Sequence, residues 1–301
     1  MTEQPNVLVP PRAVLDAFGV VGGTPVPLAG GQGRSVLVGG YVFKPAEGTE
    51  AEAEWAASLF EALAPGPGFR VPRPLRTADG RSLVDGWTAH AFLAGTPGPR
   101  GHWADVLSAG RAFHAALRGL PRPGFLGRHT HPWAVADRVA WGEQDAEVIA
   151  DLAAPFSALL ALRRPVRQDA AQLVHGDLTG NVLFAPDQVP VVIDFSPYWR
   201  PPLFAEAVVI ADGLLWFGLP PGYSSGLGSG LPSGLRSSPP SAPAAGGGHP
   251  DWQQMLIRAL IFRLVAESEN AGPGGRARPG EADRYVRAAE AVLRGPQARR
   301  R

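Results

Sequence analysis

The sequence contains no cysteine among its 301 residues, which excludes disulfide bonds and thiolate metal sites. Lysine is almost as rare, because Lys44 is the only lysine among 28 basic residues. A chain so dependent on Arg, and so rich in Ala, Gly and Pro, is typical of a GC-rich genome that replaces Lys wherever Arg will serve. The one lysine that is left therefore needs an explanation.

The sequence also lacks any apolar run that approaches the roughly 18 residues of a membrane helix. Its start, Met-Thr-Glu-Gln-Pro-Asn, is polar, which predicts no signal peptide and a cytoplasmic location. A formal net charge of +1 gives no argument for nucleic acid or an anionic membrane as a partner. The apolar fraction of 45% and charged fraction of 18% are those of a soluble globular protein, whose oligomeric state composition leaves open.

The N-terminal third combines short strand-like runs with helical patterns. A helical pattern ends at Gly19 and closes an N-terminal segment, residues 1–19. Short β-like runs separated by glycine clusters follow. Residues 47–63 then repeat large apolar side chains every four positions from Trp55, behind a start rich in acidic residues, which indicates a helix. Residues 20–95 are therefore predicted to form a small β-rich lobe with one helix.

The remainder, residues 96–301, is predicted to form a larger and mainly helical lobe. A stretch at about 219–250 consists of Gly, Ser and Pro with almost nothing to bury, so we expect a disordered insertion there. The helical patterns lie at residues 102–120, 140–164, 204–218 and 251–269.

The strongest signal is "VHGDLTGNVLF", residues 174–184, followed by "VVIDFS", residues 191–196. The two apolar runs predict a hairpin that brings Asp177, Asn181 and Asp194 to one end of a sheet. Two carboxylates and an amide form an oxygen-ligand set suited to Mg²⁺, which completes its shell with water and phosphate oxygens. The alternative interpretation is that the first two residues only cap turns. Both strands and both aspartates follow one another in the order that a metal site requires, and this favours the metal site over simple turn caps.

These motifs resemble the aminoglycoside phosphotransferase and choline kinase-like branch of the protein-kinase fold. That family has His-Gly-Asp-Leu followed by Asn, and its metal aspartate lies in an Ile-Asp-Phe/Trp segment. The resemblance covers roughly residues 20–215, and more narrowly the chain is similar to a group of uncharacterised actinobacterial members. It implies an α+β, bilobal protein-kinase-like fold with a small β-rich N-lobe and a larger, mainly helical C-lobe.

The resemblance also implies roles for these residues. Asp177 becomes the catalytic base or the group that orients the acceptor hydroxyl, Asn181 and Asp194 become metal ligands, and His175 holds the catalytic loop. One departure is that three residues separate Asp177 from Asn181, whereas the family pattern has four. Gly180 permits backbone angles that other residues avoid, so a tighter loop can still direct Asn181 to the metal.

In this frame Lys44 ends the third strand and contacts the α- and β-phosphates of ATP as a compact ammonium, which Arg does not replace. Chance survival on the surface is the alternative interpretation. Upstream, Gly30, Gly31 and Gly33 are predicted to form a turn whose N–H groups approach the phosphates. The resemblance implies a helix glutamate as the partner of Lys44. Glu52 lies on the apolar face of its helix and is the predicted partner, with Glu54 as the alternative.

Three further segments are placed by the resemblance. Phe92 and Leu93, in "HAFLAG", lie where the hinge would hold the adenine ring through backbone groups. His114 is interpreted as a satisfied core histidine. Arg200, in "SPYWRPP", either binds an anionic substrate or stands in a segment that only braces the loop.

The sequence therefore predicts an ATP- and Mg²⁺-dependent phosphotransferase that acts on a hydroxyl of an unidentified small molecule. The alternative is a nucleotide-binding regulatory module without turnover, and the shortened loop is its best support. Against it, every catalytic position is filled by a competent residue. No activation segment ending in Ala-Pro-Glu follows Asp194, which disfavours a protein substrate.

Overall fold

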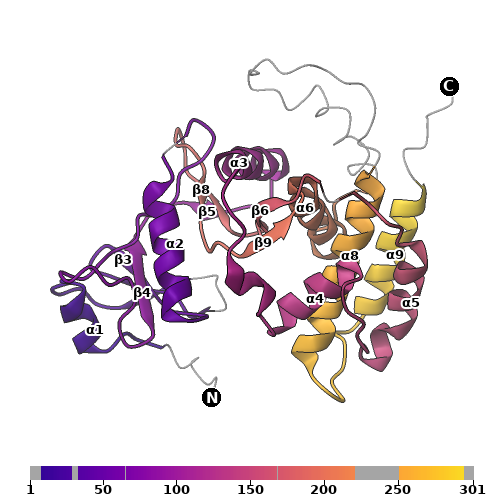
Figure 1. The fold of residues 1–301 in the computed structure, drawn as a ribbon, viewed down its shortest axis with the longest axis horizontal. Helices are drawn as coiled ribbons and strands as arrows, with labels where there is room; N and C mark the ends of the chain where they lie inside the picture. Colours follow the sequence, from indigo (N-terminus) through magenta and orange to yellow (C-terminus); the bar gives the residue numbers. More distant parts are fainter. Residues whose placement is uncertain (1–7, 29–32, 65, 168, 221–250, 295–301) are drawn as a thin grey trace. The chain divides into compact units, whose positions relative to one another are not determined.

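A computed structural model describes residues 8–28, 33–64, 66–167, 169–220 and 251–294 (Figure 1). The chain divides into two compact units. The first comprises residues up to Gly101 together with Gly180–Phe195, and the second comprises His102–Thr179 together with residues from Ser196 onward. The predicted fold class, a β-rich first part and a larger helical second part, is confirmed. In the described part of the chain, no helix is long and apolar enough to cross a membrane.

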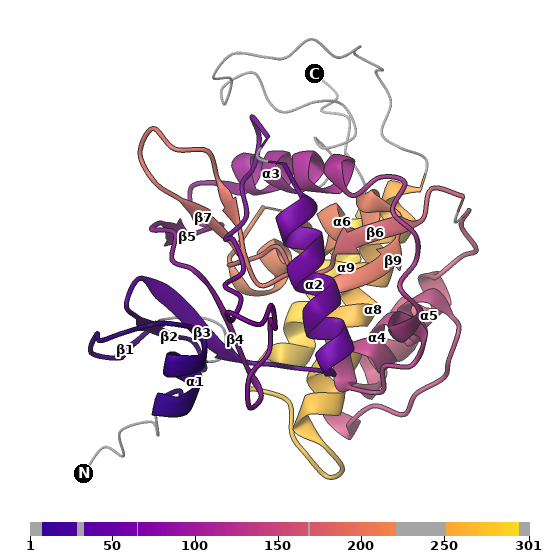
Figure 2. The same ribbon diagram turned by 60° about the vertical axis from the view of Figure 1, so that its left-hand side comes forward.

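The first unit is built on an antiparallel sheet in the order β1-β2-β3-β4. The edge strand, Val26–Pro27, pairs with Val36–Val38, which pairs with Tyr41–Pro45, and Trp87–Ala91 closes the sheet. Helix α1, Arg12–Ala17, packs on this sheet (Figures 1 and 2). The segment after residue 70 makes only isolated bridges and no regular strand, because its prolines lack N–H donors.

Helix α2, Glu50–Ala62, begins with a capping box. The Thr49 hydroxyl accepts from the Glu52 N–H, and the Glu52 carboxylate accepts from the Thr49 N–H. Further along the helix, Trp55 and Phe60 lie against Phe195, with ring centroids 6.3 and 6.0 Å apart. The helix therefore packs directly against the residue that follows Asp194.

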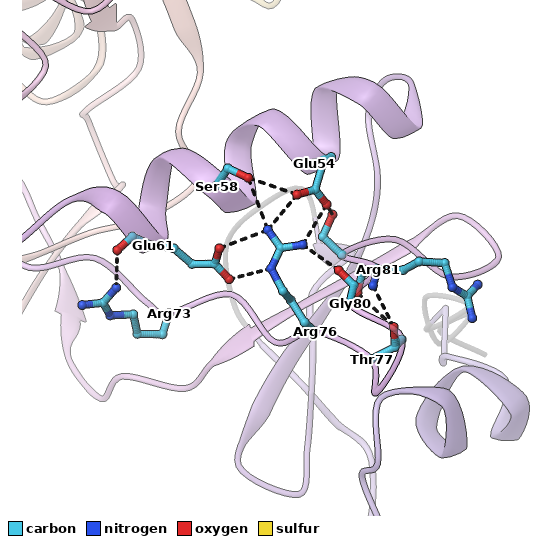
Figure 3. A network of polar contacts seen from close by, with 9 residues as sticks. Glu54, Ser58, Glu61, Arg73, Arg76, Thr77, Gly80 and Arg81 are labelled. Atoms are coloured by element: carbon cyan, nitrogen blue, oxygen red, sulfur yellow. Dashed lines mark hydrogen bonds and ion pairs between the residues drawn. The ribbon is translucent and has the colours of Figure 1, made fainter.

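The outer face of α2 is held by Arg76, as Figure 3 shows. Its guanidinium donates to both oxygens of Glu54 at 2.8 Å and to both oxygens of Glu61 at 2.7 and 3.0 Å. It also donates to the Gly80 carbonyl oxygen at 2.7 Å. These hydrogen bonds lower the pKa of Glu54 from 4.5 to about 2. Arg76 thus fixes α2 to the loop that precedes β4.

We expect Arg76→Met to destabilise the protein at pH 7 by about 1 kcal/mol, since the paired side chains are partly exposed and screened by solvent. Because the folded-state pKa of Glu54 is depressed, the contribution of this pair is fully present above pH 4.5. It is lost as the pH falls from 4.5 toward about 2. The difference in melting temperature between the two proteins should therefore be largest near pH 7 and clearly smaller at pH 3.

Arg73→Met is the matched control, because Arg73 binds α2 only through the Glu61 carbonyl oxygen in the described hydrogen bonds. It should cost less stability than Arg76→Met. A difference between wild type and Arg76→Met that stayed constant down to pH 3 would contradict the role given to the Glu54 pair.

A second, three-stranded sheet explains why the two units divide differently from the predicted lobes. Its central strand β7, Val182–Phe184, pairs with β8, Val191–Val192, as the predicted hairpin requires, and with β5, Thr96–Pro97. The backbone N–H of Arg70 donates to the Pro190 carbonyl oxygen, and its carbonyl oxygen accepts from the N–H of Val192 in β8. The hairpin was assigned to the C-lobe, but these contacts join it to the first unit.

The second unit is a group of helices around α8, Trp252–Ala271, which contacts α4, α5, α6 and α9 (Figures 1 and 2). A two-stranded ribbon of β6 and β9 packs beside α3 and α6. The remaining bounds are α3 Trp103–Ala116, α4 Pro132–Trp141, α5 Ala153–Leu162, β6 Gln172–His175, β9 Pro197–Arg200, α6 Pro202–Trp216 and α9 Glu281–Arg294.

One predicted segment needs correction, and most of another lies outside the described residues. The continuous helical reading of residues 140–164 is wrong, because α4 ends at Gly142 in the left-handed region, with φ +74°, and α5 starts only at Ala153. Most of the predicted insertion falls on residues 221–250, outside the described residues. Its first residue, Leu219, is buried and packs over Gly213 of α6.

Candidate active site

The hairpin end in the first unit carries the two predicted metal ligands. Asn181 directly precedes β7, and its carbonyl oxygen accepts from the N–H of Ile193 at 2.9 Å. Asp194 is the next residue, so both side chains belong to the same end of the hairpin. Gly180 has φ +83° and Asp194 has φ +51°, both in the left-handed region. The tight turn that the sequence required of Gly180 is therefore present.

Lys44 forms an ion pair with Asp194, which lies 150 residues further along the sequence. Strand β3 supplies the lysine opposite Thr88 of β4, and the hairpin supplies the carboxylate. The side chains remain 24% and 34% exposed, so both charges are within reach of a ligand. Burial and the nearby Lys44 cation lower the pKa of His90 to about 4, so that imidazole is neutral at pH 7.

The predicted lysine partner on α2, Glu52, takes part in a capping box. The Glu52 carboxylate belongs to the capping box, with its Oε2 accepting from the Thr49 N–H at 3.4 Å, whereas the ion pair of Lys44 is formed with Asp194. Glu54, the alternative, is bound through both oxygens by Arg76. Glu54 is thus a structural anchor of α2, and a contact of Glu52 with Lys44 in a nucleotide complex stays a prediction.

The other predicted nucleotide contacts are covered in part. Gly30 and Gly31 lie outside the described residues. Gly33 has φ +69°, and a Cβ at this position would meet no heavy atom within 4 Å. Phe92 is 40% exposed, and its N–H donates to the Gly40 carbonyl oxygen at 3.0 Å. An adenine contact at this predicted hinge would therefore use the Phe92 carbonyl or the backbone of Leu93.

The catalytic-loop motif lies in the second unit, where two buried histidines hold it. The N–H of His175 donates to Nε2 of His114 at 3.0 Å, and the N–H of Asp177 donates to Nδ1 of His175 at 3.1 Å. Burial lowers the pKa of His114 to about 3, and the neighbouring His175 acts in the same direction, so His114 stays neutral. His114 is thus the core histidine that the sequence suggested, but it is not fully satisfied, because its buried Nδ1 has no hydrogen-bond partner among the described residues.

Close packing fixes the residues on either side of Asp177. A Cβ at Gly176 would lie 2.3 Å from the Tyr198 ring, so only glycine fits under that ring. A Cβ at Gly110 of α3 would lie 2.6 Å from Leu178, which is buried there. The Asp177 side chain itself remains 42% exposed. The loop is therefore rigid on its inner side and presents a carboxylate on the other.

Sequence reasoning missed a cation at this carboxylate. Arg263 of α8 donates through Nη2 to Asp177 Oδ1 at 2.7 Å.

The sequence analysis also missed strand β9, which contains Arg200. That arginine is buried and bonds Asp137 and Glu143 at 2.6 to 3.2 Å, so it braces the structure and is no substrate ligand.

Each unit thus has a distinct chemical capacity. The first unit offers an ammonium group beside a carboxylate and an amide at one hairpin end, which suits phosphate oxygens together with a hard divalent cation. The second offers a rigidly held, partly exposed carboxylate that can accept a hydrogen bond or a proton from a hydroxyl group.

Comparisons with known proteins bear on the family and the fold of this chain. The model of the phosphotransferase enzyme family (APH) matches residues 25–212. A spectinomycin phosphotransferase, solved in complex with ADP and spectinomycin, gives a TM-score of 0.50 at 14% identity over 93% of this chain and 95% of that one. An aminoglycoside phosphotransferase from Alicyclobacillus acidocaldarius subsp. acidocaldarius gives 0.56 at 16% identity over 97% and 96%.

At such low identity these two structures bear on the fold alone. A search among curated proteins finds no match. The matched residues of the family model include Lys44, Asp177, Asn181 and Asp194, and they cover well over half of the chain. The chain belongs to the phosphotransferase enzyme family, APH.

Proposed function

We propose that this protein transfers the γ-phosphoryl group of MgATP to a hydroxyl group of a small molecule. The observation that carries the proposal is the ion pair between the only lysine of the chain and Asp194 at the end of the hairpin. Lys44 would bind the α- and β-phosphates, and Asp177 would orient or deprotonate the acceptor hydroxyl. Glu52, the glycines from Gly30 and the predicted hinge would complete the nucleotide site.

A divalent cation fits the donor set at the hairpin end. Asp194 supplies a carboxylate and Asn181 an amide oxygen, which are ligand types that Mg²⁺ prefers, and Mg²⁺ commonly binds with few protein ligands. When bound, the ion would neutralise charge on the transferring phosphoryl group. The chain's own residues would do the positioning: Lys44 on the phosphates and Asp177 on the acceptor.

For the acceptor, the charges on the C-terminal helices argue against a polycation. A site for a polyamine-like antibiotic needs acidic side chains that are not already neutralised by the protein. Arginines pair with the acidic residues of these helices for which ion pairs are described: Glu206 with Arg111, Asp212 with Arg263, Glu267 with Arg278 and Glu281 with Arg284. We therefore propose an acceptor with hydroxyl groups and little positive charge.

Thermal shift with nucleotide tests the first half of this proposal. At about 100 times its dissociation constant, a ligand stabilises the folded state by about 2.7 kcal/mol. MgATP should therefore raise the melting temperature of the wild type, and ATP with EDTA should raise it less. Asp194→Asn should abolish the magnesium-dependent part, because the triphosphate loses its bridge to the protein.

Asp187→Asn is the matched control. Asp187 lies in the turn of the same hairpin and shares the positive φ of Asp194, at +55°. Asn tolerates that conformation in both variants, so any backbone effect is the same. Equal magnesium-dependent shifts in Asp194→Asn and wild type would remove Asp194 from the nucleotide site. A turnover screen over hydroxylated metabolites then identifies the acceptor.

The regulatory module without turnover is the competing function. It predicts the same thermal shift but no acceptor-dependent ADP release. The family match gives it no support, and Lys44, Asp177, Asn181 and Asp194, the residues that the proposed reaction would use, all lie within the matched range.

A further inference from the structure

The second unit contains a buried cluster of charges that leads from its helices to Asp177. Arg263 of α8 donates through Nε and Nη2 to the two oxygens of Asp212 at 2.6 and 2.7 Å. The same Nη2 donates to Asp177 Oδ1 at 2.7 Å. The side chains of Arg263 and Asp212 are 5% and 2% exposed, against 42% for Asp177. One guanidinium therefore links a solvent-accessible carboxylate to a buried one.

We propose that Arg263, held by Asp212, is the positioning residue that orients the Asp177 carboxylate for phosphoryl transfer. This inference rests on the proposed function. The hydrogen bond from Arg263 to Oδ1 would fix the orientation of the Asp177 carboxylate toward the acceptor hydroxyl. A catalytic base must lie within hydrogen-bond reach of the proton it accepts, so fixing its rotamer contributes to the rate.

The geometry requires arginine. Nε and Nη2 both donate to Asp212, and Nη2 also donates to Asp177. Only a planar, forked cation can make this arrangement. Lysine would carry the same charge without this fork. Aromatic rings hold the guanidinium in place, since Trp133 and Phe262 each lie 5.4 Å from it. Burial opposes the charged form, but the two carboxylates outweigh it and raise the pKa of Arg263.

Stability alone gives a poor reason for such a cluster. Buried ion pairs are often no more stabilising than well-packed apolar side chains of similar volume. Here one arginine serves two carboxylates, and it lies among the apolar side chains of α6 and α8. If Arg263 orients Asp177, the presence of Arg263 and Asp212 in this part of the core is explained.

Arg200 provides a matched control in the same unit. It is also a buried arginine, 7% exposed, that bonds two carboxylates, those of Asp137 and Glu143. Its described ion pairs do not include Asp177. Arg200→Lys therefore reports the general cost of replacing a buried, forked arginine by lysine.

The test measures steady-state kinetics of folded Arg263→Lys and Arg200→Lys on the acceptor found by the turnover screen. Arg263→Lys should lose about 10²-fold in kcat, the effect of a displacement of about 1 Å at a reacting centre, with KM for MgATP unchanged. Arg200→Lys should keep the wild-type kcat. In an Asp177→Asn background, Arg263→Lys should lower kcat no further, because it acts through that carboxylate.

If Arg263→Lys does not fold, Asp212→Asn is the second variant, since it leaves Arg263 in place but holds it less firmly, and a loss of about 10-fold in kcat is expected. Wild-type kcat in both variants, or the same loss in Arg200→Lys, would overturn the positioning role while transfer itself stands. A wild-type enzyme that transfers phosphate to no acceptor would refute the proposed function and this role with it.

Discussion

Asp177→Asn should lower kcat for phosphoryl transfer by about 10³-fold, within the range of a lost general base. In the proposed function the carboxylate accepts the hydrogen bond of the acceptor hydroxyl, and an amide could not take its proton. The change in shape is minimal, and the amide oxygen can still accept from Arg263. We therefore expect an unchanged fold and an unchanged thermal shift with MgATP, since the residues that we propose to bind the phosphates lie in the first unit.

Asp169→Asn, at an exposed aspartate of the same unit that pairs with Arg167, is the control and should retain full activity. Initial rates of product formation at saturating MgATP decide the comparison. Wild-type kcat in Asp177→Asn would mean that the loop following His175 is not catalytic, whatever its resemblance to other kinases.

The second large effect concerns the only lysine. Lys44→Arg should fold normally but lose about 10²-fold in kcat/KM, since a longer, forked guanidinium would displace the phosphates by an amount on the order of 1 Å. Its circular dichroism spectrum and melting temperature should change little, because the side chain is partly exposed and contributes little packing.

The reciprocal exchange Arg34→Lys is the control for this measurement. Arg34 lies in the first unit and pairs with Glu47 in a largely exposed position, so lysine should serve there equally well. If Lys44→Arg turned over like the wild type, the single lysine would be an accident of drift and its phosphate-binding role would be wrong.

The sequence predicted the hairpin and the polar residues at its end because all of these signals are local. Two apolar runs, a turn and polar residues at the strand ends determine where Asn181 and Asp194 lie. The structure adds that Lys44, 150 residues from Asp194, forms an ion pair with it. That pairing follows from the order of the strands, which a resemblance to a family indicates and composition alone does not.

Arg263 could not be predicted as the partner of Asp177, because the contact spans 86 residues and joins a helix to a loop. A signal was nevertheless present. Arg263 and Asp212 are charged residues inside strongly apolar helical patterns, and such residues are rarely buried without a partner of opposite charge.

Glu52 illustrates two local patterns that compete for one residue. Its spacing to Trp55 and Leu59 placed it on the inner face of α2, whereas Thr-x-x-Glu at residues 49–52 is also a capping box. The structure contains the capping box, and the contact of Glu52 with Lys44 stays a prediction. The outer anchor, Arg76, lies in a proline-rich segment whose irregular path no periodicity indicates.

The most direct test of the phosphotransferase function is the transfer of labelled γ-phosphate from MgATP to the acceptor identified by the screen. The wild type should form one phosphorylated product for each ADP, and Asp177→Asn should form it about 10³-fold more slowly while binding MgATP equally well. Binding of MgATP without acceptor-dependent product in the wild type, or equal product formation by both proteins, would contradict the proposed function.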